Sequence, residues 1–338
     1  MTEEWNDWNP YGDYRHMPDT TCKEKKEEEE KEKKRKQKSS AEQDFEPKFK
    51  ILGDVDLRYE DVVGQKNVVE ESKKYNTLLK NKELCTLFGT TFPNLLLHGE
   101  VGTGKTLLVQ VMARENKDEQ KLLYASVNLQ DFSSKYINTS ANQLSLTLEH
   151  LVKMMESSEV PSTHCVVFID EFDSIGRKRG MENHREDDKV VNTLNTHMDG
   201  DRYKDCLSFI AATNHYNLID LAQKSRFGIH LMFEAFKTNE DKENLFKVHL
   251  ARSSRKMAPE IRGEVLKNVD CKSLAQRLKG PINGRNIRDI VNRVINNKIY
   301  EIAQDMTLSL TPEIPTENFY KVIDTYDNER KREKKIGY

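Results

Sequence analysis

Residues 95–109 read LLLHGEVGTGKTLLV. An apolar run ends at His98, a turn with three glycines follows, and apolar residues resume after Lys105 and Thr106. Short runs of consecutive apolar residues are typical of strands buried on both faces, and clustered glycines mark a tight turn. The stretch therefore predicts a buried strand that passes through a glycine-rich loop into a helix.

The apolar run at 94–98 is followed by similar runs at 122–127, 165–169, 207–212 and 229–233, separated by helical patterns at 106–116, 141–155 and 187–198. Alternating strands and helices predict an α/β fold, a parallel sheet with helices on both faces. After about residue 237 only helical patterns continue, at 239–252, 273–278, 284–304 and 316–323. We expect a small all-helical domain there.

Composition divides the chain into four segments. We expect a charged tail at 1–48, a large α/β domain at 49–236, a helical domain at 237–326 and a basic tail at 327–338. Residues 23–38, KEKKEEEEKEKKRKQK, bury nothing and stay solvated. Lys33–Lys36 is either part of this linker or a signal for nuclear import or nucleic-acid contact. The aromatic residues before it are either loose or anchors for a partner, namely Trp5, Trp8, Tyr11 and Tyr14.

The overall composition excludes several classes of protein. The net charge is −2 with 33% charged residues, so nothing global indicates a nucleic-acid or membrane partner. No apolar run approaches the ~18 residues that span a bilayer, and the N-terminus lacks the pattern of a secretion signal. The five cysteines are widely spaced and predict free thiols. We expect a cytoplasmic protein.

The glycine-rich loop has the spacing G-x-x-x-x-G-K-T, which is typical of a phosphate cradle. Glycines let backbone N–H groups converge on phosphate oxygens at the start of a helix, where the helix dipole adds positive charge. We expect Lys105 to neutralise the β- and γ-phosphates of ATP and Thr106 to supply a hydroxyl to Mg²⁺. The predicted loop residues are Gly99, Glu100, Val101, Gly102, Thr103, Gly104, Lys105 and Thr106.

Polar residues follow two further predicted strands. Asp170 and Glu171 end the run VVFIDE, at the sheet edge where α/β proteins bind ligands. Asp170 is expected to hold Mg²⁺ and Glu171 to polarise the attacking water. Asn214 follows the strand at 207–212 and either orients that water or belongs to an ordinary turn.

Together these motifs resemble the AAA+ ATPases, and most closely the AAA module of FtsH-type proteases. The resemblance rests on the phosphate loop and on FIDEFDSIGRKRG at 168–180, HREDDKVVNTLNTHMDG at 184–200 and AATNHYNLID at 211–220. DVVGQKNVVEE at 61–71, LFKVHL at 245–250 and TENFYKVID at 316–324 extend it over about 55–326. It implies a P-loop NTPase sheet followed by an AAA lid domain.

The resemblance also implies roles for individual residues. Val63, Gly64 and Leu107 would help to hold the nucleotide, and Asn214 would be a sensor of the γ-phosphate. Arg226 would be an arginine finger that reaches the nucleotide of a neighbouring subunit. Arg285 would be a second sensor, or with Arg288 a solvent-facing residue. Lys135, Tyr136 and Ile137 would form a pore loop that grips a polypeptide, although Tyr136 also fits an ordinary surface position.

The chain departs from the family at several positions. Glu100 and Val101 stand where two prolines are usual, and Asp201 replaces a phenylalanine after Asp199 and Gly200. The segment before Arg226 is shorter than usual. The printed sequence contains no H-E-x-x-H zinc-protease motif. We therefore expect an ATPase without a protease site.

Three functions are compatible with these residues. The first is an ATP-driven remodeller that unfolds or translocates a protein substrate through a homo-oligomeric ring, a hexamer by resemblance, with the aromatic tail recruiting a substrate or adaptor. The second is an AAA+ ATPase that acts on nucleic acid, which only the basic stretches at 33–36 and 330–335 favour. The third is a nucleotide-gated scaffold without hydrolysis, which the intact catalytic residues argue against.

Overall fold

The computed structural model describes residues 46–90, 92–117, 122–132, 139–157, 164–174, 185–200, 206–304 and 313–336. Contacts divide the chain into two units, Met1–Glu46 and Pro47–Tyr338, and all elements below belong to the second. The four predicted segment boundaries therefore stay predictions. Of the helices in the described ranges, none has both the length and the apolar character that crossing a bilayer requires.

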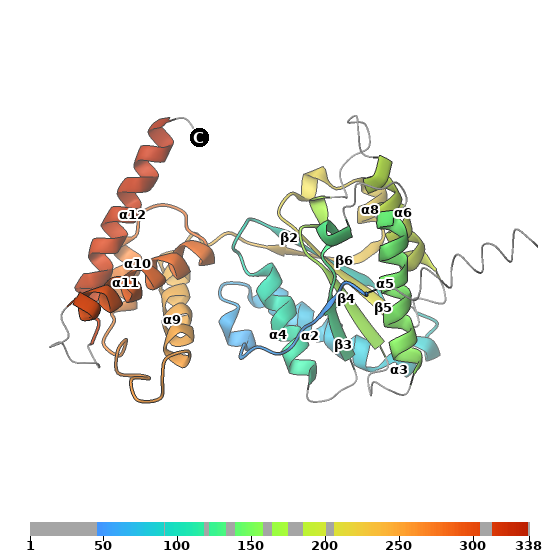
Figure 1. Ribbon diagram of the computed structural model, residues 1–338, viewed down its shortest axis with the longest axis horizontal. Coiled ribbons are helices and arrows are strands. Elements are labelled where there is room, and N and C mark those ends of the chain that lie inside the picture. Colours follow the sequence, from blue (N-terminus) through green and yellow to red (C-terminus); the bar gives the residue numbers. More distant parts are fainter. Residues whose placement is uncertain are drawn as a thin grey trace, which may run out of the picture. The chain divides into compact units, whose positions relative to one another are not determined.

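A sheet in the order β1-β3-β4-β5-β2-β6 forms the centre of the α/β part (Figure 1). Its strands are β1 (Lys50–Ile51), β2 (Asn94–Gly99), β3 (Leu122–Ser126), β4 (His164–Ile169), β5 (Leu207–Thr213) and β6 (Phe227–Phe233). All neighbours pair in parallel except β1, which is antiparallel to β3. The predicted α/β class and its five predicted strands are confirmed, and the short β1 is an addition.

Helices cover both faces of this sheet because each central strand is apolar on both sides. Leu96 packs into the core beneath α5 (Thr139–Glu156) and α6 (Arg185–Asp199). Leu95 and Leu97 point to the opposite core, beneath α2 (Lys66–Lys80) and α4 (Lys105–Lys117). This alternation is the two-residue period of a strand. Two short helices, α3 (Lys82–Leu87) and α8 (Leu221–Lys224), complete the α/β part.

The helical part consists of α9 (Asn239–Arg255), α10 (Cys271–Arg277), α11 (Gly284–Gln304) and α12 (Thr316–Ile336), which share a separate apolar core. A capping box at Thr238 and Asp241 starts α9, and the Asp270 carboxylate caps α10. The predicted helix at 284–304 is confirmed at both ends. α12 continues beyond the predicted end at 323 to Ile336, although its last turns are highly charged.

The strand order brings the predicted functional residues to one edge. β4, β5 and β2 are consecutive neighbours and run in parallel, so their carboxyl ends meet. Gly99 ends β2, Asp170 follows β4 and Asn214 follows β5. Ligands of α/β sheets bind at this edge. The fold therefore places three separate sequence motifs around one site.

Candidate active site

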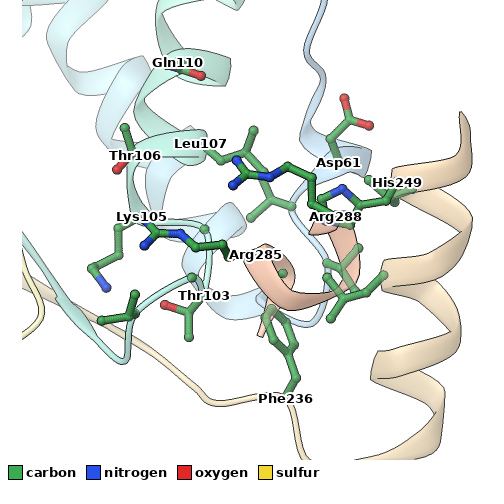
Figure 2. Close-up of a pocket in the computed structure, with 18 of the residues that line it drawn as sticks. Asp61, Thr103, Lys105, Thr106, Leu107, Gln110, Phe236, His249, Arg285 and Arg288 are labelled. Carbon is green, nitrogen blue, oxygen red and sulfur yellow. The ribbon is translucent and has the colours of Figure 1, made fainter. Parts of the chain in front are cut away.

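A pocket of about 310 Å³ lies at this edge, between the start of α4 and the helices α9 and α11. Figure 2 shows Lys105, Thr106 and Leu107 on one side, with Arg285 and Arg288 extending toward them from the other. Among the predicted site residues, Val63, Val101–Leu107, Asp170, Glu171, Asn214 and Arg285 line the pocket. Gly64, Gly99, Glu100 and Arg226 are not among its lining residues.

Two glycines of the loop are required by close backbone packing. Gly99 has φ 145°, and a Cβ atom there would lie 2.4 Å from the carbonyl oxygen of Phe233 in β6. Gly102 has φ 75°, and a Cβ atom there would lie 2.9 Å from the Asn283 side chain. Its carbonyl oxygen also accepts a 3.0 Å hydrogen bond from the backbone N–H of Gly284, where α11 begins. Glycine is thus the residue that the loop geometry demands.

Lys105 is buried at the first position of α4. Its ammonium donates hydrogen bonds of 2.9 and 2.8 Å to the carbonyl oxygens of Gly99 and Glu100. Burial lowers its pKa to about 8, against the weaker opposing effect of Asp170 and Asp173. The loop therefore holds a cation at its centre, where phosphate oxygens would approach.

Thr106 and Asp170 are joined directly, because the Thr106 hydroxyl donates a 2.7 Å hydrogen bond to Asp170 Oδ2. A hydroxyl oxygen and a carboxylate oxygen this close together are oxygen ligands of the kind that Mg²⁺ prefers. Mg²⁺ usually takes only one or two protein ligands and completes its shell with phosphate and water. The pair fits that donor set.

Glu171 has an unusual backbone. Within the described ranges it is the non-glycine residue with positive φ, at 50°. Its backbone N–H donates to Asp170 Oδ1 at 2.9 Å, and its Oε2 accepts a 3.2 Å hydrogen bond from Gln130 Nε2. A non-glycine residue in this region costs energy and is held there by its surroundings. The side chain that is expected to polarise water is therefore fixed in a strained turn.

Asn214 lines the pocket at the end of β5, next to a buried pair that the sequence analysis missed. The Thr213 hydroxyl donates a 2.7 Å hydrogen bond to Asp173 Oδ1 and accepts one of 3.0 Å from the N–H of His215. These contacts connect the turn after β4 to the turn after β5. An acid three residues after Asp170, and a threonine before Asn214, were the available signals.

Gln65 is a second residue that the sequence analysis missed. Its buried side-chain amide bonds both backbone groups of Glu234, with Nε2 donating to O at 2.8 Å and Oε1 accepting from N at 3.1 Å. Gly64, with φ 71°, leaves room for the Phe236 ring, which would lie 3.1 Å from a Cβ atom. The segment that carries Val63 is thus attached to the end of β6.

The side of the pocket formed by α9 and α11, which we call the lid side, carries additional basic residues. Arg252 and Arg285 form neither a hydrogen bond nor an ion pair with another described residue. Burial, followed by the charges of Arg252 and Arg288, lowers the pKa of His249 to about 4, so this ring is neutral at pH 7. Burial also lowers the pKa of Arg252. Unpaired arginines beside a neutral histidine leave this wall attractive to an anion.

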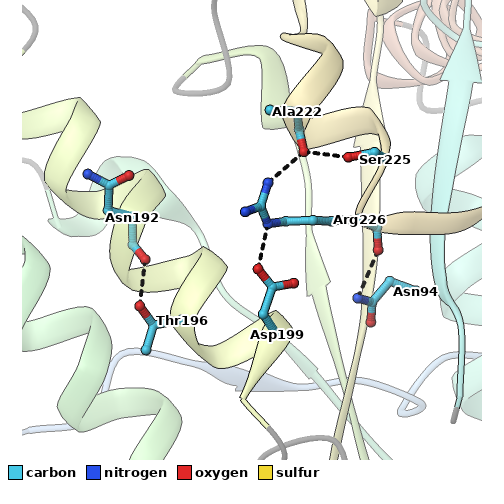
Figure 3. A network of polar contacts seen from close by, with 7 residues as sticks. All are labelled: Asn94, Asn192, Thr196, Asp199, Ala222, Ser225 and Arg226. Carbon is cyan, nitrogen blue, oxygen red and sulfur yellow. Dashed lines mark hydrogen bonds and ion pairs between the residues drawn. The ribbon is translucent and has the colours of Figure 1, made fainter.

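Arg226 lies elsewhere, directly before the edge strand β6 (Figure 3). Its Nε donates to Asp199 Oδ2 at 2.9 Å, and its Nη1 donates to the carbonyl oxygen of Ala222 at 2.6 Å. Asn94 holds the backbone, because its Nδ2 donates to the Arg226 carbonyl oxygen at 3.2 Å. The guanidinium is therefore held by its own subunit, away from its own pocket.

Three further predictions concern residues without a described structure. The pore-loop residues Lys135, Tyr136 and Ile137 lie outside the described residues. Residues 1–45 of the predicted tail at 1–48 and Asp201 also lie outside them. Their predicted roles stay predictions.

A phosphate loop at the carboxyl edge of a parallel sheet, with an acidic pair after the neighbouring strand, defines the P-loop nucleotide-hydrolase class. Residues 95–235 match the model of one family in this class, the ATPase family associated with various cellular activities (AAA). Residues 95–235 therefore form an AAA ATPase domain, and the resemblance to AAA ATPases stated from the motifs is confirmed for them.

Curated relatives agree with this assignment. The chain is 30% identical to the ATP-dependent zinc metalloprotease FtsH of Parabacteroides distasonis, over 70% of this chain and 32% of that protein. It is 29% identical to a Methanocaldococcus jannaschii protein described as a 26S proteasome regulatory subunit homolog, over 75% of this chain and 63% of that protein. The chain thus spans about a third of the FtsH relative and less than two thirds of the archaeal one.

Proposed function

We propose that the chain hydrolyses ATP and uses the energy to remodel or unfold a protein substrate as a homo-oligomeric ring. One observation carries this proposal. The pocket gathers Lys105, Thr106, Asp170, Glu171 and Asn214 in one subunit, while Arg226 is held outside that pocket. If Arg226 is the arginine finger of this reaction, a neighbouring subunit has to supply it to the pocket.

Each of these residues would contribute to a different part of ATP hydrolysis. Lys105 and the loop N–H groups would bind the β- and γ-phosphates, and Glu171 would accept a proton from the attacking water while Asn214 orients it. Thr106 and Asp170 would hold Mg²⁺, which neutralises developing phosphate charge when bound. Arg285 would contact the phosphates from the lid, and Arg226 of the adjacent subunit would stabilise the transition state.

A protein substrate is favoured by the relatives. They are described as FtsH proteases and as a proteasome regulatory subunit homolog, and both names concern proteins that act on proteins. We infer that Tyr136 contacts the substrate and that the aromatic tail recruits it or an adaptor.

The test is the ATPase rate of the full chain with an unfolded polypeptide, with DNA, and with neither. We expect the polypeptide to stimulate the rate and DNA to leave it unchanged. Stimulation by DNA alone would favour the nucleic-acid hypothesis instead. Tyr136→Ala should preserve the basal rate and remove unfolding of a tagged substrate, whereas the exposed Tyr300→Ala in α11 should preserve both.

A further inference from the structure

A cluster of four side chains connects the turn after β5 to the start of β6, and the proposed function does not use it. Its members are His98 at the end of β2, Tyr216 in the turn after Asn214, Lys224 at the end of α8 and His230 in β6. We call these residues the Tyr216 cluster. They lie close to the predicted catalytic residues in sequence, since Tyr216 follows Asn214 by two positions and Lys224 precedes Arg226 by two.

Hydrogen bonds fix the His230 side of the cluster. His230 Nε2 lies 2.9 Å from the carbonyl oxygen of Phe227 and 3.2 Å from that of Lys224. Carbonyl oxygens only accept, so Nε2 carries the hydrogen and donates. In the neutral ring Nδ1 then accepts from the Tyr216 hydroxyl, at 3.0 Å. One imidazole therefore ties Tyr216 to the end of α8.

Ring contacts fix the other side. The Lys224 ammonium lies over the Tyr216 ring, 4.1 Å from its centroid, which is cation–π geometry. The His98 ring stacks on Tyr216 at 4.2 Å between centroids. Burial lowers the pKa of His98, and the nearby positive charges of Lys105 and Lys224 lower it further, which favours the neutral ring. Tyr216 thus contacts both α8 and the residue that precedes the phosphate loop.

α8 holds the Arg226 side chain and backbone in place. The Arg226 guanidinium donates to the carbonyl oxygen of Ala222 within α8, and the Arg226 N–H donates to that of Gln223. A shift of this four-residue helix would carry the guanidinium with it. Because Lys224 and His230 hold the end of α8 to Tyr216, the position of Tyr216 sets that of α8.

We propose that Tyr216, Lys224 and His230 are positioning residues that orient Arg226 for the nucleotide of the neighbouring subunit. This inference rests on the proposed role of Arg226 in trans. The contacts are directional and lie outside the pocket lining, so the cluster affects turnover through the arginine and leaves nucleotide binding by its own subunit unchanged. His98 extends the cluster to the phosphate loop of the subunit that offers the arginine.

Mixed assemblies test this directly. A donor subunit with Glu171→Gln keeps Arg226 but has no turnover of its own, and an acceptor subunit with Arg226→Ala keeps its own site. Mixing the two should restore ATPase activity, because the donor supplies Arg226 to the acceptor site. Tyr216→Phe is then placed in the donor alone or in the acceptor alone. It removes the hydroxyl that binds His230 and keeps the ring, so folding is preserved.

We expect Tyr216→Phe in the donor to lower the restored kcat about five-fold, the factor that corresponds to about 1 kcal/mol for one hydrogen bond, with KM unchanged. The same change in the acceptor should have no effect. Lys224→Gln in the donor should act in the same direction. Tyr300→Phe, which alters a surface hydrogen bond to Gln304, is the matched control and should have no effect in either subunit.

Each outcome is decisive. A loss confined to the donor supports the inference. An equal loss in both subunits, a loss confined to the acceptor, or no loss at all overturns it and leaves the trans role of Arg226 intact. Failure of the unmodified mixture to regain activity overturns the trans role itself, and the inference with it.

Discussion

The two walls of the pocket differ in how their polar side chains are paired within the chain. On the sheet side, Lys105 donates to loop carbonyls, Thr106 to Asp170 and Gln130 to Glu171. On the lid side, Arg252 and Arg285 have neither a hydrogen bond nor an ion pair with another described residue. The sheet wall is thus preorganised, whereas the lid wall presents unpaired positive charge.

This difference has a physical consequence for how nucleotide would act on each wall. Preorganised groups need little rearrangement when charge develops on a phosphate, which favours catalysis. Unpaired arginines gain charge-assisted hydrogen bonds only when an anion arrives, which favours closing of the lid on that anion. We therefore expect changes in the sheet wall to affect binding and chemistry strongly, and changes in the lid wall to affect affinity moderately.

The largest effect is expected from removing the central cation of the sheet wall. Lys105→Ala should weaken ATP binding by at least about 100-fold, because a buried charged donor to phosphate is lost. Isothermal titration calorimetry measures this loss. Lys74→Ala, in an exposed ion pair with Glu71, is the control and should bind normally. Near-normal affinity of Lys105→Ala would remove the phosphate loop from the proposed site.

The next largest effect separates chemistry from binding in the same wall. Glu171→Gln should lower ATP turnover by about 100-fold or more while ATP still binds, since a positioned general base contributes that much. The trapped ATP should also stabilise the assembly, which size-exclusion chromatography with ATP can show. Glu100→Gln, at an exposed loop position outside the pocket lining, is the matched control. Unchanged turnover of Glu171→Gln would mean that another residue is the base.

The lowered pKa of Lys105 predicts a pH dependence of binding. Its pKa is about 8 in the chain without nucleotide, so the ammonium is lost as the pH rises above 8. Binding of an anionic triphosphate favours the charged form, and above pH 8 binding must take up a proton. The dissociation constant should therefore rise by up to about tenfold per pH unit above 8.

Calorimetry between pH 7 and 9.5, in buffers of different ionisation enthalpy, measures this proton uptake. Lys105→Arg keeps its charge over the whole range and should show a flat profile. Proton release, or a wild-type profile as flat as that of the arginine variant, would contradict the assignment.

The lid wall should respond differently. Arg285→Ala should weaken ATP binding about tenfold, the loss of one charge-assisted hydrogen bond, and the loss should shrink at high salt. Because Arg285 has no partner in the described structure, the melting temperature without nucleotide should stay unchanged. Arg293 lies on the same helix as Arg285 and forms a surface ion pair with Glu329 of α12, so Arg293→Ala is the control for affinity. Equal affinities of the two variants would exclude Arg285 from the site.

The same two walls show what could be predicted from sequence. The catalytic residues of the sheet wall, from Lys105 to Asn214, were predictable because each lies in a short contiguous motif at the end of an apolar strand, and parallel strands bring their ends together. His249 and Arg252 were missed because which face of α9 turns toward the pocket depends on packing within the helical core. Gln65 was missed because its partner Glu234 is 169 residues away.

Other features depend on contacts between residues that no local pattern connects. The sequence gives no signal that Tyr216, Lys224 and His230 belong together, and only the fold brings them into contact. The end of α12 was underestimated because its charged turns resemble a solvated tail, yet Arg293 of α11 pairs with Glu329 there. Long-range pairing therefore decided the features that local patterns did not predict.

The smallest effect is expected at the two loop positions where prolines are usual in the family. Neither Glu100 nor Val101 has positive φ, so neither adopts the left-handed conformation that would rule out proline. The Glu100 carbonyl already accepts 2.8 Å hydrogen bonds from Lys105 Nζ and Thr103 Oγ1, which hold the loop in shape. Proline acts mainly by lowering the conformational entropy of the unfolded chain, which stabilises the folded protein by roughly 0.4–1 kcal/mol per site.

The double variant Glu100→Pro and Val101→Pro should therefore raise the melting temperature slightly. Its ATP affinity should change less than about threefold, a factor that corresponds to about 0.6 kcal/mol of binding free energy. Differential scanning fluorimetry and calorimetry measure the two quantities on the same samples. A large gain in affinity would mean that the loop is loose before nucleotide binds. The sheet wall would then not be preorganised, and the proposed difference between the two walls would be wrong.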